Sequence, residues 1–517
     1  MSWRIKNDGT YLSDLKTRLA VESRKQCSDM NNKYNSKRFK TQPNINLRYS
    51  SKIQFNLTTI IPNIYIEKDE IKFFYIGINA SQKQADSSSS IRNSIMNEKY
   101  LSSPYVYCEK RSLVRNKDDE KDSKRQRQQL HITGCILACG QNICGQIGMK
   151  PNIIERKKPQ LVQLFNEENE NIVQVCAGAI HSCALTQTGK VFTWGCNDDS
   201  ALGRLTIEIE DEFQPKQIVL PEAILQIAAG DSFTFARGNS GTIYGCGCFR
   251  STVGILGLLS PKNVEKLPII IPFNEKIKTI ACAADFCLFL TNNGEVYSFG
   301  NGETGQLGRD QNKSEYLTNN IIENWLRPSK IPTFENKFIE NIWCGGHGFF
   351  VKIKEKNKAP YIMACGANSF TQLGIDTKTP VYEPIKVDNF SMIKNIQKIA
   401  CGLQHTLILD YEGNVFGVGR VDDGRLGVLN LKHNISKPVN IKTLKSIVDI
   451  DAGGSVSFAI DQEGNVYSFG MGDTAQTGHG SEDIFEPKLI EGKQLYSRII
   501  HRVTAGAQHT LFLATSK

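Results

Sequence analysis

The chain has 517 residues, of which 40% are hydrophobic and 22% are charged, and a formal net charge of +9, a balance typical of soluble proteins. It contains no run of about eighteen apolar residues and its N-terminus lacks the apolar core of a signal peptide, so we expect no membrane span and a protein that stays inside the cell. The 15 cysteines include no CxxC pair, which favours buried free thiols over disulfides or a zinc site.

Residues 1–130 are predicted to be a basic, mostly disordered extension. They hold 25 Lys and Arg against 14 Asp and Glu and are rich in Ser and Asn, whereas residues 131–517 are nearly neutral. A basic cluster lies at the end of this segment, formed by Lys121, Lys124, Arg125 and Arg127. Two interpretations of the cluster remain open: a solvated linker, or a nuclear-import signal or phosphate-binding arm.

Residues 173–204 contain the unit around which the rest of the chain is organised. The pattern predicts strands over Val173–Ala177, His181–Thr186 and Lys190–Trp194, joined by a glycine corner and by a turn that Gly189 closes. These strands are short and rich in aromatic and β-branched residues, as in sheets that are buried between neighbouring sheets.

The same unit returns along the chain. Corner-plus-strand segments include CAGAIHSCAL, ACGLQHTLIL and TAGAQHTLFL, strand-plus-turn segments include VFTWGCNDDSALG, VYSFGNGETGQLG and VFGVGRVDDGRLG, and each type occurs seven times. The glycines that end the third strand of each unit lie roughly 51 to 66 residues apart, which is the spacing of propeller blades. We therefore predict an all-β fold, a seven-bladed β-propeller over residues 131–517.

The two ends of the repeat predict how the ring closes. The first copy, near Ile136, is a strand-plus-turn element with no corner before it, and the last copy, which ends near Thr515, is a corner-plus-strand element with no turn after it. Each is half a blade, and pairing the halves in one sheet removes the exposed edges of an open array. We expect Ile136–Cys139 to lie beside His509–Leu513.

Two segments depart from the repeat and are candidate functional loops, because function in a propeller lies on loops held by a rigid ring. CFRSTVGILGLLSP lengthens the third strand-plus-turn copy at Phe249–Val253, which predicts a projecting hairpin with Arg250 near its tip. GRDQNKSEYLTNNIIENWLRPSKIP, in the following copy, predicts a short helix over Asn320–Arg327 with Trp325 as its apolar anchor.

Several sequence patterns resemble cofactor-binding or catalytic motifs, but the segments around them do not suit those functions. Gly300–Gly305 matches GxGxxG, but it follows a blade strand without the helix of a dinucleotide site. His181, His405 and His509 each stand three residues after a corner glycine, and this recurrence favours structural hydrogen bonds inside the blade over catalysis. We find no Ser/His/Asp set, carboxylate pair or metal cluster, so we expect no catalytic residue, metal or cofactor.

Several stretches outside the repeat carry a more specific resemblance: IIERKKPQLV, CNDDSALGR, CFRSTVGILGLLSP, GRVDDGRLG, and FGMGDTAQTGHGSED followed by GKQLYSRI. From about Cys135 to Ser516 the chain resembles the regulator of chromosome condensation family, whose nuclear members are guanine-nucleotide exchange factors for the small GTPase Ran. The resemblance implies exchange without covalent chemistry, in the nucleus and in support of nucleocytoplasmic transport and mitosis, with the cytoplasm as the alternative location.

The resemblance also implies which residues contact the GTPase. The family inserts a hairpin wedge beside the phosphate site, and Phe249–Gly254 matches it. The implied contacts are Asp231, Arg250, Ser251, Thr252, Asp285, Arg309, Gln404 and His509. For Asp231 and Asp285 the alternative is that the carboxylate caps its own corner.

Four positions depart from the family pattern. Ile143 stands where an acidic residue is usual, and Gln404 stands where a histidine is usual; Phe233 and Phe286 replace histidines of the repeat. Glutamine keeps a hydrogen bond but cannot charge, so the resemblance leaves reduced activity or a changed partner open.

A second implied partner is the nucleosome, through its histone surface and DNA phosphate, with the Lys121–Arg127 arm as the DNA contact. We expect a monomer and no membrane partner. Two alternatives remain: a non-catalytic interaction propeller that scaffolds another GTPase, a traffic assembly or a ubiquitin assembly, and a propeller enzyme with a site in the central channel.

Overall fold

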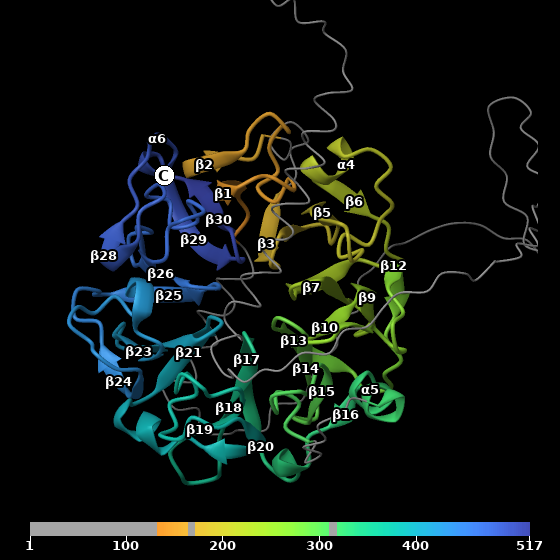
Figure 1. Ribbon diagram of the computed structural model, residues 1–517, viewed down its shortest axis with the longest axis vertical. Coiled ribbons are helices and arrows are strands. Elements are labelled where there is room, and N and C mark those ends of the chain that lie inside the picture. The colour runs from red at the N-terminus through yellow and green to blue at the C-terminus, as the bar shows by residue number, and fades with distance from the viewer. Residues whose placement is uncertain (1–131, 164–170, 310–317) are drawn as a thin grey trace, which may run out of the picture. The chain divides into compact units, whose positions relative to one another are not determined.

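Seven four-stranded antiparallel sheets form a closed ring, the predicted seven-bladed β-propeller (Figure 1). This computed structural model describes residues 132–163, 171–309 and 318–517. The predicted extension over residues 1–130, including the Lys121–Arg127 cluster, lies outside the described residues. Within the described ranges, no helix is long and apolar enough to cross a bilayer.

The blades follow one another in chain order, each given from its inner to its outer strand. Blade 1 comprises β3 (Ile172–Ala177), β4 (His181–Thr186), β5 (Val191–Gly195) and β6 (Lys216–Ile218). Blade 2 comprises β7 (Ile224–Ala229), β8 (Phe233–Gly238), β9 (Ile243–Gly247) and β12 (Glu265–Ile270), with the hairpin β10 (Phe249–Ser251) and β11 (Gly254–Gly257) between its last two strands. Blade 3 comprises β13 (Ile277–Cys282), β14 (Phe286–Thr291), β15 (Val296–Gly300) and β16 (Ser329–Lys330).

The remaining blades repeat the arrangement. Blade 4 comprises β17 (Ile339–Gly345), β18 (Gly348–Ile353), β19 (Tyr361–Gly366) and β20 (Val381–Lys386), and blade 5 comprises β21 (Ile396–Cys401), β22 (His405–Asp410), β23 (Val415–Gly419) and β24 (Ile435–Asn440). Blade 6 comprises β25 (Ile447–Ala452), β26 (Val456–Asp461), β27 (Val466–Gly470) and β28 (Ile484–Leu489). The short helices are α4 (Glu210–Phe213), α5 (Asn319–Trp325) and α6 (Lys493–Tyr496), and 3-10 turns cover Pro332–Phe334, Asp388–Met392 and Asp422–Gly424.

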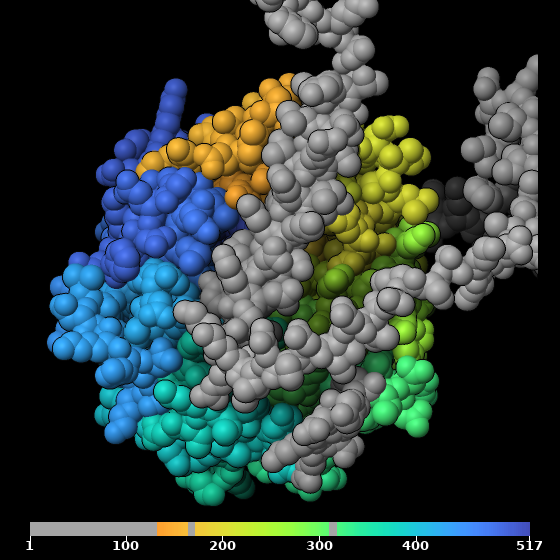
Figure 2. Space-filling model, in the orientation of Figure 1, coloured from red at the N-terminus to blue at the C-terminus, as the bar shows by residue number. Residues whose placement is uncertain are grey.

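Blade 7 is built from both ends of the propeller and confirms the predicted closure. Its strands are β29 (Arg498–Ala505), β30 (His509–Ser516), β1 (Cys135–Gln141) and β2 (Glu155–Leu161). Ile136 pairs with Leu513 and Cys139 pairs with Thr510. Figure 2 shows the orange β1–β2 region beside the blue C-terminal strands, and each inner strand contacts the inner strands of both neighbouring blades.

Blade 1 shows why these residues form strands. All residues of β4 and β5 are buried, so both faces of these two strands pack against neighbouring blades. Gly195 ends β5 with φ +103, and a Cβ there would lie 2.6 Å from the Cα of His181. A side chain at this repeat glycine would separate the second strand from the third.

The recurring histidines make structural hydrogen bonds, as predicted, but these bonds join adjacent blades and do not lie inside one blade. His181 Nε2 lies 3.0 Å from the Thr234 hydroxyl, and His405 Nε2 lies 2.8 Å from the Ser457 hydroxyl, in each case on the second strand of the next blade. Burial lowers the pKa of His181 to about 4 and that of His405 to about 3. Both imidazoles are therefore neutral in the folded chain at pH 7.

The neutral histidines predict a measurable pH dependence of stability. Below pH 6.5 the unfolded chain binds a proton at His405 that the folded chain does not bind, so falling pH favours unfolding. His405→Gln should therefore lower the slope of unfolding free energy against pH by about 1.4 kcal/mol per pH unit between roughly pH 6 and 4. Urea unfolding at several pH values measures this slope; an unchanged slope would show that His405 is protonated in the folded state.

Candidate functional site

The described candidate residues lie on one face of the ring, which we term the corner face. In every blade the corner between the inner and second strands lies at the same end of the sheet as the connection from the third to the outer strand, because neighbouring strands are antiparallel. Backbone hydrogen bonds join adjacent corners: Asp231 N donates to Ala284 O at 2.8 Å, and Ala507 N donates to Ala179 O at 3.0 Å. The corners of adjacent blades are therefore hydrogen-bonded to one another on the corner face.

The predicted hairpin is present on this face as β10–β11. Its first residue, Phe249, is completely buried, with ring centroids 4.6 Å from Phe233 and 5.2 Å from Phe299. Phe233, which replaces a histidine of the repeat, thus packs against the base of the hairpin. The tip is solvent-exposed, since 78% of Val253 and 39% of Ile255 remain accessible.

Acidic residues of the ring hold the backbone and side chains of the hairpin. Asp285 Oδ1 accepts the Arg250 backbone N–H at 2.8 Å, and Arg250 Nη1 lies 2.8 Å from both carboxylate oxygens of Asp199. Thr252 donates its backbone N–H and its hydroxyl to Glu303, at 3.1 and 2.6 Å. These bonds hold the hairpin to the ring from its base up to its turn at Thr252, while the side chain of Val253 in the same turn stays exposed.

Two of the predicted acidic contacts, Asp231 and Asp285, lie in neighbouring corners. Burial raises the pKa of Asp231 to about 6. Burial, and next the charge of Asp231, raise the pKa of Asp285 well above its usual range. A cationic group of a partner would stabilise the charged form of both. In the free chain, Asp285 caps the backbone of the hairpin rather than its own corner.

Arg309 and His509 lie in this region, but both side chains are hydrogen-bonded to other residues of the chain. Arg309 Nη2 donates to the carbonyl oxygens of Asn324 and Arg327 at 2.9 and 3.2 Å, at the end of α5. His509 is completely buried, and its Nε2 lies 2.8 Å from the Ser182 hydroxyl. The prediction that His509 contacts a partner through its side chain does not fit this conformation, because no part of the imidazole reaches the surface.

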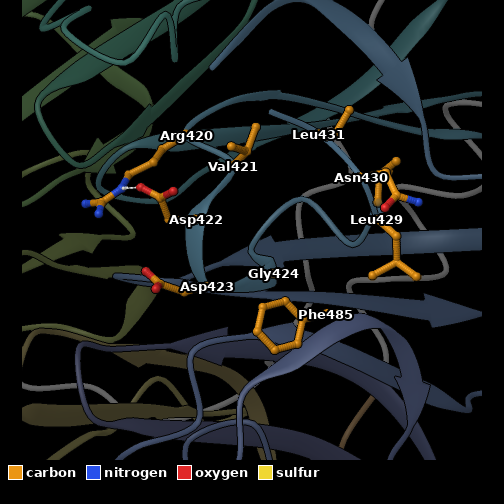
Figure 3. Close-up of a pocket in the computed structure, with 10 residues that line it drawn as sticks. Arg420, Val421, Asp422, Asp423, Gly424, Leu429, Asn430, Leu431 and Phe485 are labelled. Atoms are coloured by element: carbon orange, nitrogen blue, oxygen red, sulfur yellow. Dashed lines mark hydrogen bonds and ion pairs between the residues drawn. The ribbon is translucent and has the colours of Figure 1, made fainter. Parts of the chain in front are cut away.

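Gln404 is hydrogen-bonded to Arg420, one of the residues that line a pocket between blades 5 and 6 (Figure 3). Its Oε1 accepts a hydrogen bond from Arg420 Nη1 at 2.7 Å, and Arg420 Nε donates to Asp422 Oδ2 at 2.7 Å. The pocket has a volume of about 510 Å³ and is lined by residues that include Arg420, Asp422, Leu429 and Phe485. Apolar and charged groups thus lie side by side on the corner face.

Sequence reasoning missed three residues that shape this face: Asp199, Glu303 and Arg420. The sequence does contain a signal for Asp199 and Glu303, which is their spacing. Asp199 lies 51 positions before Arg250, and Glu303 lies 51 positions after Thr252. This separation is about one blade, so the members of each pair occupy related positions in adjacent blades. The corner face combines a fixed apolar tip with poorly solvated carboxyls, an arrangement suited to binding a protein partner.

Comparisons with known proteins agree with this architecture. The family model of the RCC1-like domain matches residues 135–512. The regulator of chromosome condensation of Xenopus laevis is 35% identical over 399 residues, which cover 75% of this chain and 91% of that relative. The guanine nucleotide exchange factor SRM1 of Saccharomyces cerevisiae is 27% identical over 433 residues, covering 73% and 86%. The crystal structure of Prp20p from the same yeast, described with its binding to Gsp1p and histones, has a TM-score of 0.69 at 26% identity and covers 76% of this chain and 95% of its own.

Proposed function

The chain belongs to the RCC1-like domain family, and on this premise we propose that it is a guanine-nucleotide exchange factor for the small GTPase Ran. The observation that carries the proposal is the braced hairpin β10–β11, which presents an exposed apolar tip on the corner face. The match to the RCC1-like domain covers residues 135–512, and the hairpin lies within these residues.

The proposed mechanism is an exchange of binding partners without covalent chemistry. A small GTPase holds GDP through phosphate-cradling backbone amides and Mg²⁺, so release is slow. A protein that binds the nucleotide-free GTPase more tightly than the loaded form weakens nucleotide binding by the same factor, because coupling between two ligands is reciprocal. The cell's excess of GTP over GDP then sets the direction of exchange.

The proposed GTPase contacts combine the hairpin with the corners. The tip residues Val253 and Ile255 join the predicted contacts of the corner face, which are Asp231, Arg250, Ser251, Thr252, Asp285 and Gln404. In this account the tip displaces groups that hold the phosphates, and the poorly solvated carboxyls receive basic groups that lose their phosphate or metal partner. Arg309 holds α5 and His509 joins two blades, so we leave both out of the contact surface.

Release of a fluorescent GDP from Ran tests the proposed function. The full chain at catalytic concentration should accelerate release at least about 100-fold over the intrinsic rate, a change of about 2.7 kcal/mol in the barrier. A second small GTPase serves as the specificity control and should show its intrinsic rate. An unchanged rate with Ran would contradict the proposal.

We further propose a nuclear, chromatin-associated monomer that contacts DNA phosphate through Lys121, Lys124, Arg125 and Arg127. Replacing all four by alanine should weaken DNA binding and make the slope of log K against log salt shallower by about 3 to 4, because each neutralised phosphate contributes about 0.9. Fluorescence anisotropy over a salt series measures the slope. Equal slopes for the two proteins would show that the cluster does not touch DNA.

A further inference from the structure

We infer that Asp199 and Glu303 are positioning residues that hold the β10–β11 hairpin at a fixed angle on the corner face, so that its tip meets the GTPase already aligned. The inference rests on the proposed exchange function and adds two residues to it. Asp199 comes from the connection after β5 in blade 1, and Glu303 comes from the connection after β15 in blade 3. The hairpin of blade 2 is therefore braced from both neighbouring blades.

The Glu303 carboxylate accepts three hydrogen bonds, two of them from the turn of the hairpin. It accepts the backbone N–H and the hydroxyl of Thr252 and, at 3.1 Å, an N–H of the Asn301 side chain. Asn301 is almost fully buried, accepts the Glu303 backbone N–H at 2.7 Å and donates to Arg250 O at 2.9 Å. The Glu303 carboxylate is thus fixed by the same turn that also holds the hairpin backbone.

Asp199 braces the other side through the arginine side chain. Both of its carboxylate oxygens lie 2.8 Å from Arg250 Nη1, and Oδ2 also accepts the Ser232 hydroxyl at 2.8 Å. The side chains of Arg250 and Asp199 remain 43% and 21% exposed, so the ion pair contributes less to overall stability than a buried one would. The main effect of this ion pair is to fix the direction of the Arg250 side chain.

A hairpin of this size needs such support. Its strands have three and four residues, and an isolated two-stranded hairpin is at best marginally stable in water. Without the braces the tip would sample many orientations, and ordering it on the GTPase would cost free energy at the step where the wedge acts. Pre-positioning removes that cost before the partner arrives.

The variants Asp199→Ala, Glu303→Ala and their combination test the inference. In the combined variant, hydrogen exchange at the Thr252 and Val253 amides should be at least about tenfold faster, and kcat for GDP release from Ran should fall about tenfold with KM changed less than about twofold, a barrier change of about 1.4 kcal/mol. Asp388→Ala is the matched control, since Asp388 forms an exposed ion pair with Lys386 at 2.9 Å in blade 4. It should leave both readouts unchanged.

A second set of variants distinguishes a positioning role of Asp199 and Glu303 from a role in stability alone. In a protein whose tip carries Val253→Ser and Ile255→Ser, adding Asp199→Ala and Glu303→Ala should lower kcat by clearly less than tenfold, because the braces then align only the polar contacts of the hairpin and no longer its apolar tip. A further tenfold loss in that background would overturn the inference.

The remaining outcomes are also decisive. Normal kcat in the combined variant, or unchanged amide exchange in the hairpin, would overturn the positioning role while leaving the exchange function intact. A faster rate with Asp199→Ala would show that Asp199 withholds Arg250 from the GTPase, which also contradicts the inference. A wild-type protein inactive on Ran would instead overturn the proposed function, and the positioning role with it.

Discussion

Replacing the two apolar side chains at the hairpin tip, Val253→Ser with Ile255→Ser, should lower kcat/KM for GDP release from Ran about 30-fold. Val253 is 78% exposed and Ile255 is 39% exposed in the free chain, so the substitution takes away apolar area that the partner would cover and removes folding energy chiefly at Ile255. Truncating an anchor of an interface costs about 2 kcal/mol, which corresponds to about 30-fold in rate. Stopped-flow fluorescence of labelled GDP measures the change.

Val219→Ser is the control for this substitution. Val219 is 89% exposed and lies between β6 and β7, on the face opposite the corner face. The control should retain the full rate and the wild-type Tm, and the tip variant should remain folded at the assay temperature. If Val219→Ser slows release as much as the tip variant does, or if the tip variant is fully active, the hairpin is not the wedge.

Gly140→Ala should lower the free energy of unfolding by about 3–5 kcal/mol, because it obstructs the seam where the ring closes. Gly140 pairs with His509 across β1 and β30 and has φ +108. A Cβ there would lie 2.4 Å from Gln508 O and 2.6 Å from His509 Cα, both backbone atoms. Left-handed backbone strain costs about 1–3 kcal/mol, and forced overpacking adds about 1–3 kcal/mol.

Gly294→Ala isolates the backbone contribution at a turn glycine of blade 3. Gly294 has φ +81, but a Cβ at this residue would have no atom within 4 Å, so only the conformational cost of about 1–2 kcal/mol is expected. Urea denaturation of both variants gives the comparison. Equal losses of stability would mean that the two chain ends do not pack against each other as they do in blade 7.

Much of the fold follows from local chemistry. The pattern predicts the second strand of blade 1 over His181–Thr186, and it is found there, since apolar residues between a corner glycine and a turn glycine leave little freedom of register. The expected helix over Asn320–Arg327 is found as Asn319–Trp325, with Trp325 buried as its anchor. Ring closure is also predictable, because two half-blades at the ends of a repeat can complete only each other.

The candidate site is only partly predictable. The sequence places Arg250 on a projecting hairpin, but which carboxylate meets its guanidinium depends on the angle between blades, and that angle is set by packing over the whole ring. The separation of 51 residues from Arg250 makes Asp199 a candidate, but sequence alone does not select it as the partner of the guanidinium. Arg309 is expected to face a partner, yet the insertion that forms α5 brings carbonyl oxygens within its reach.

His509 illustrates a conflict between two inferences from one residue. Its place in the repeat predicts a structural hydrogen bond, whereas the family resemblance implies a partner contact. The structure buries it against Ser182, as it buries His181 and His405 at the equivalent positions. A position that recurs in several blades is constrained by the contacts between blades, so the repeat is the better guide there.

The affinity of the chain for Ran in different nucleotide states tests the exchange mechanism most directly. Because coupling is reciprocal, the protein should bind nucleotide-free Ran more tightly than GDP-loaded Ran, by the same factor by which it weakens GDP binding. Titration of immobilised Ran, stripped of nucleotide or loaded with GDP, gives the two Kd values. We predict a ratio of at least about 100, a coupling of about 2.7 kcal/mol, and equal Kd values would contradict the proposed mechanism.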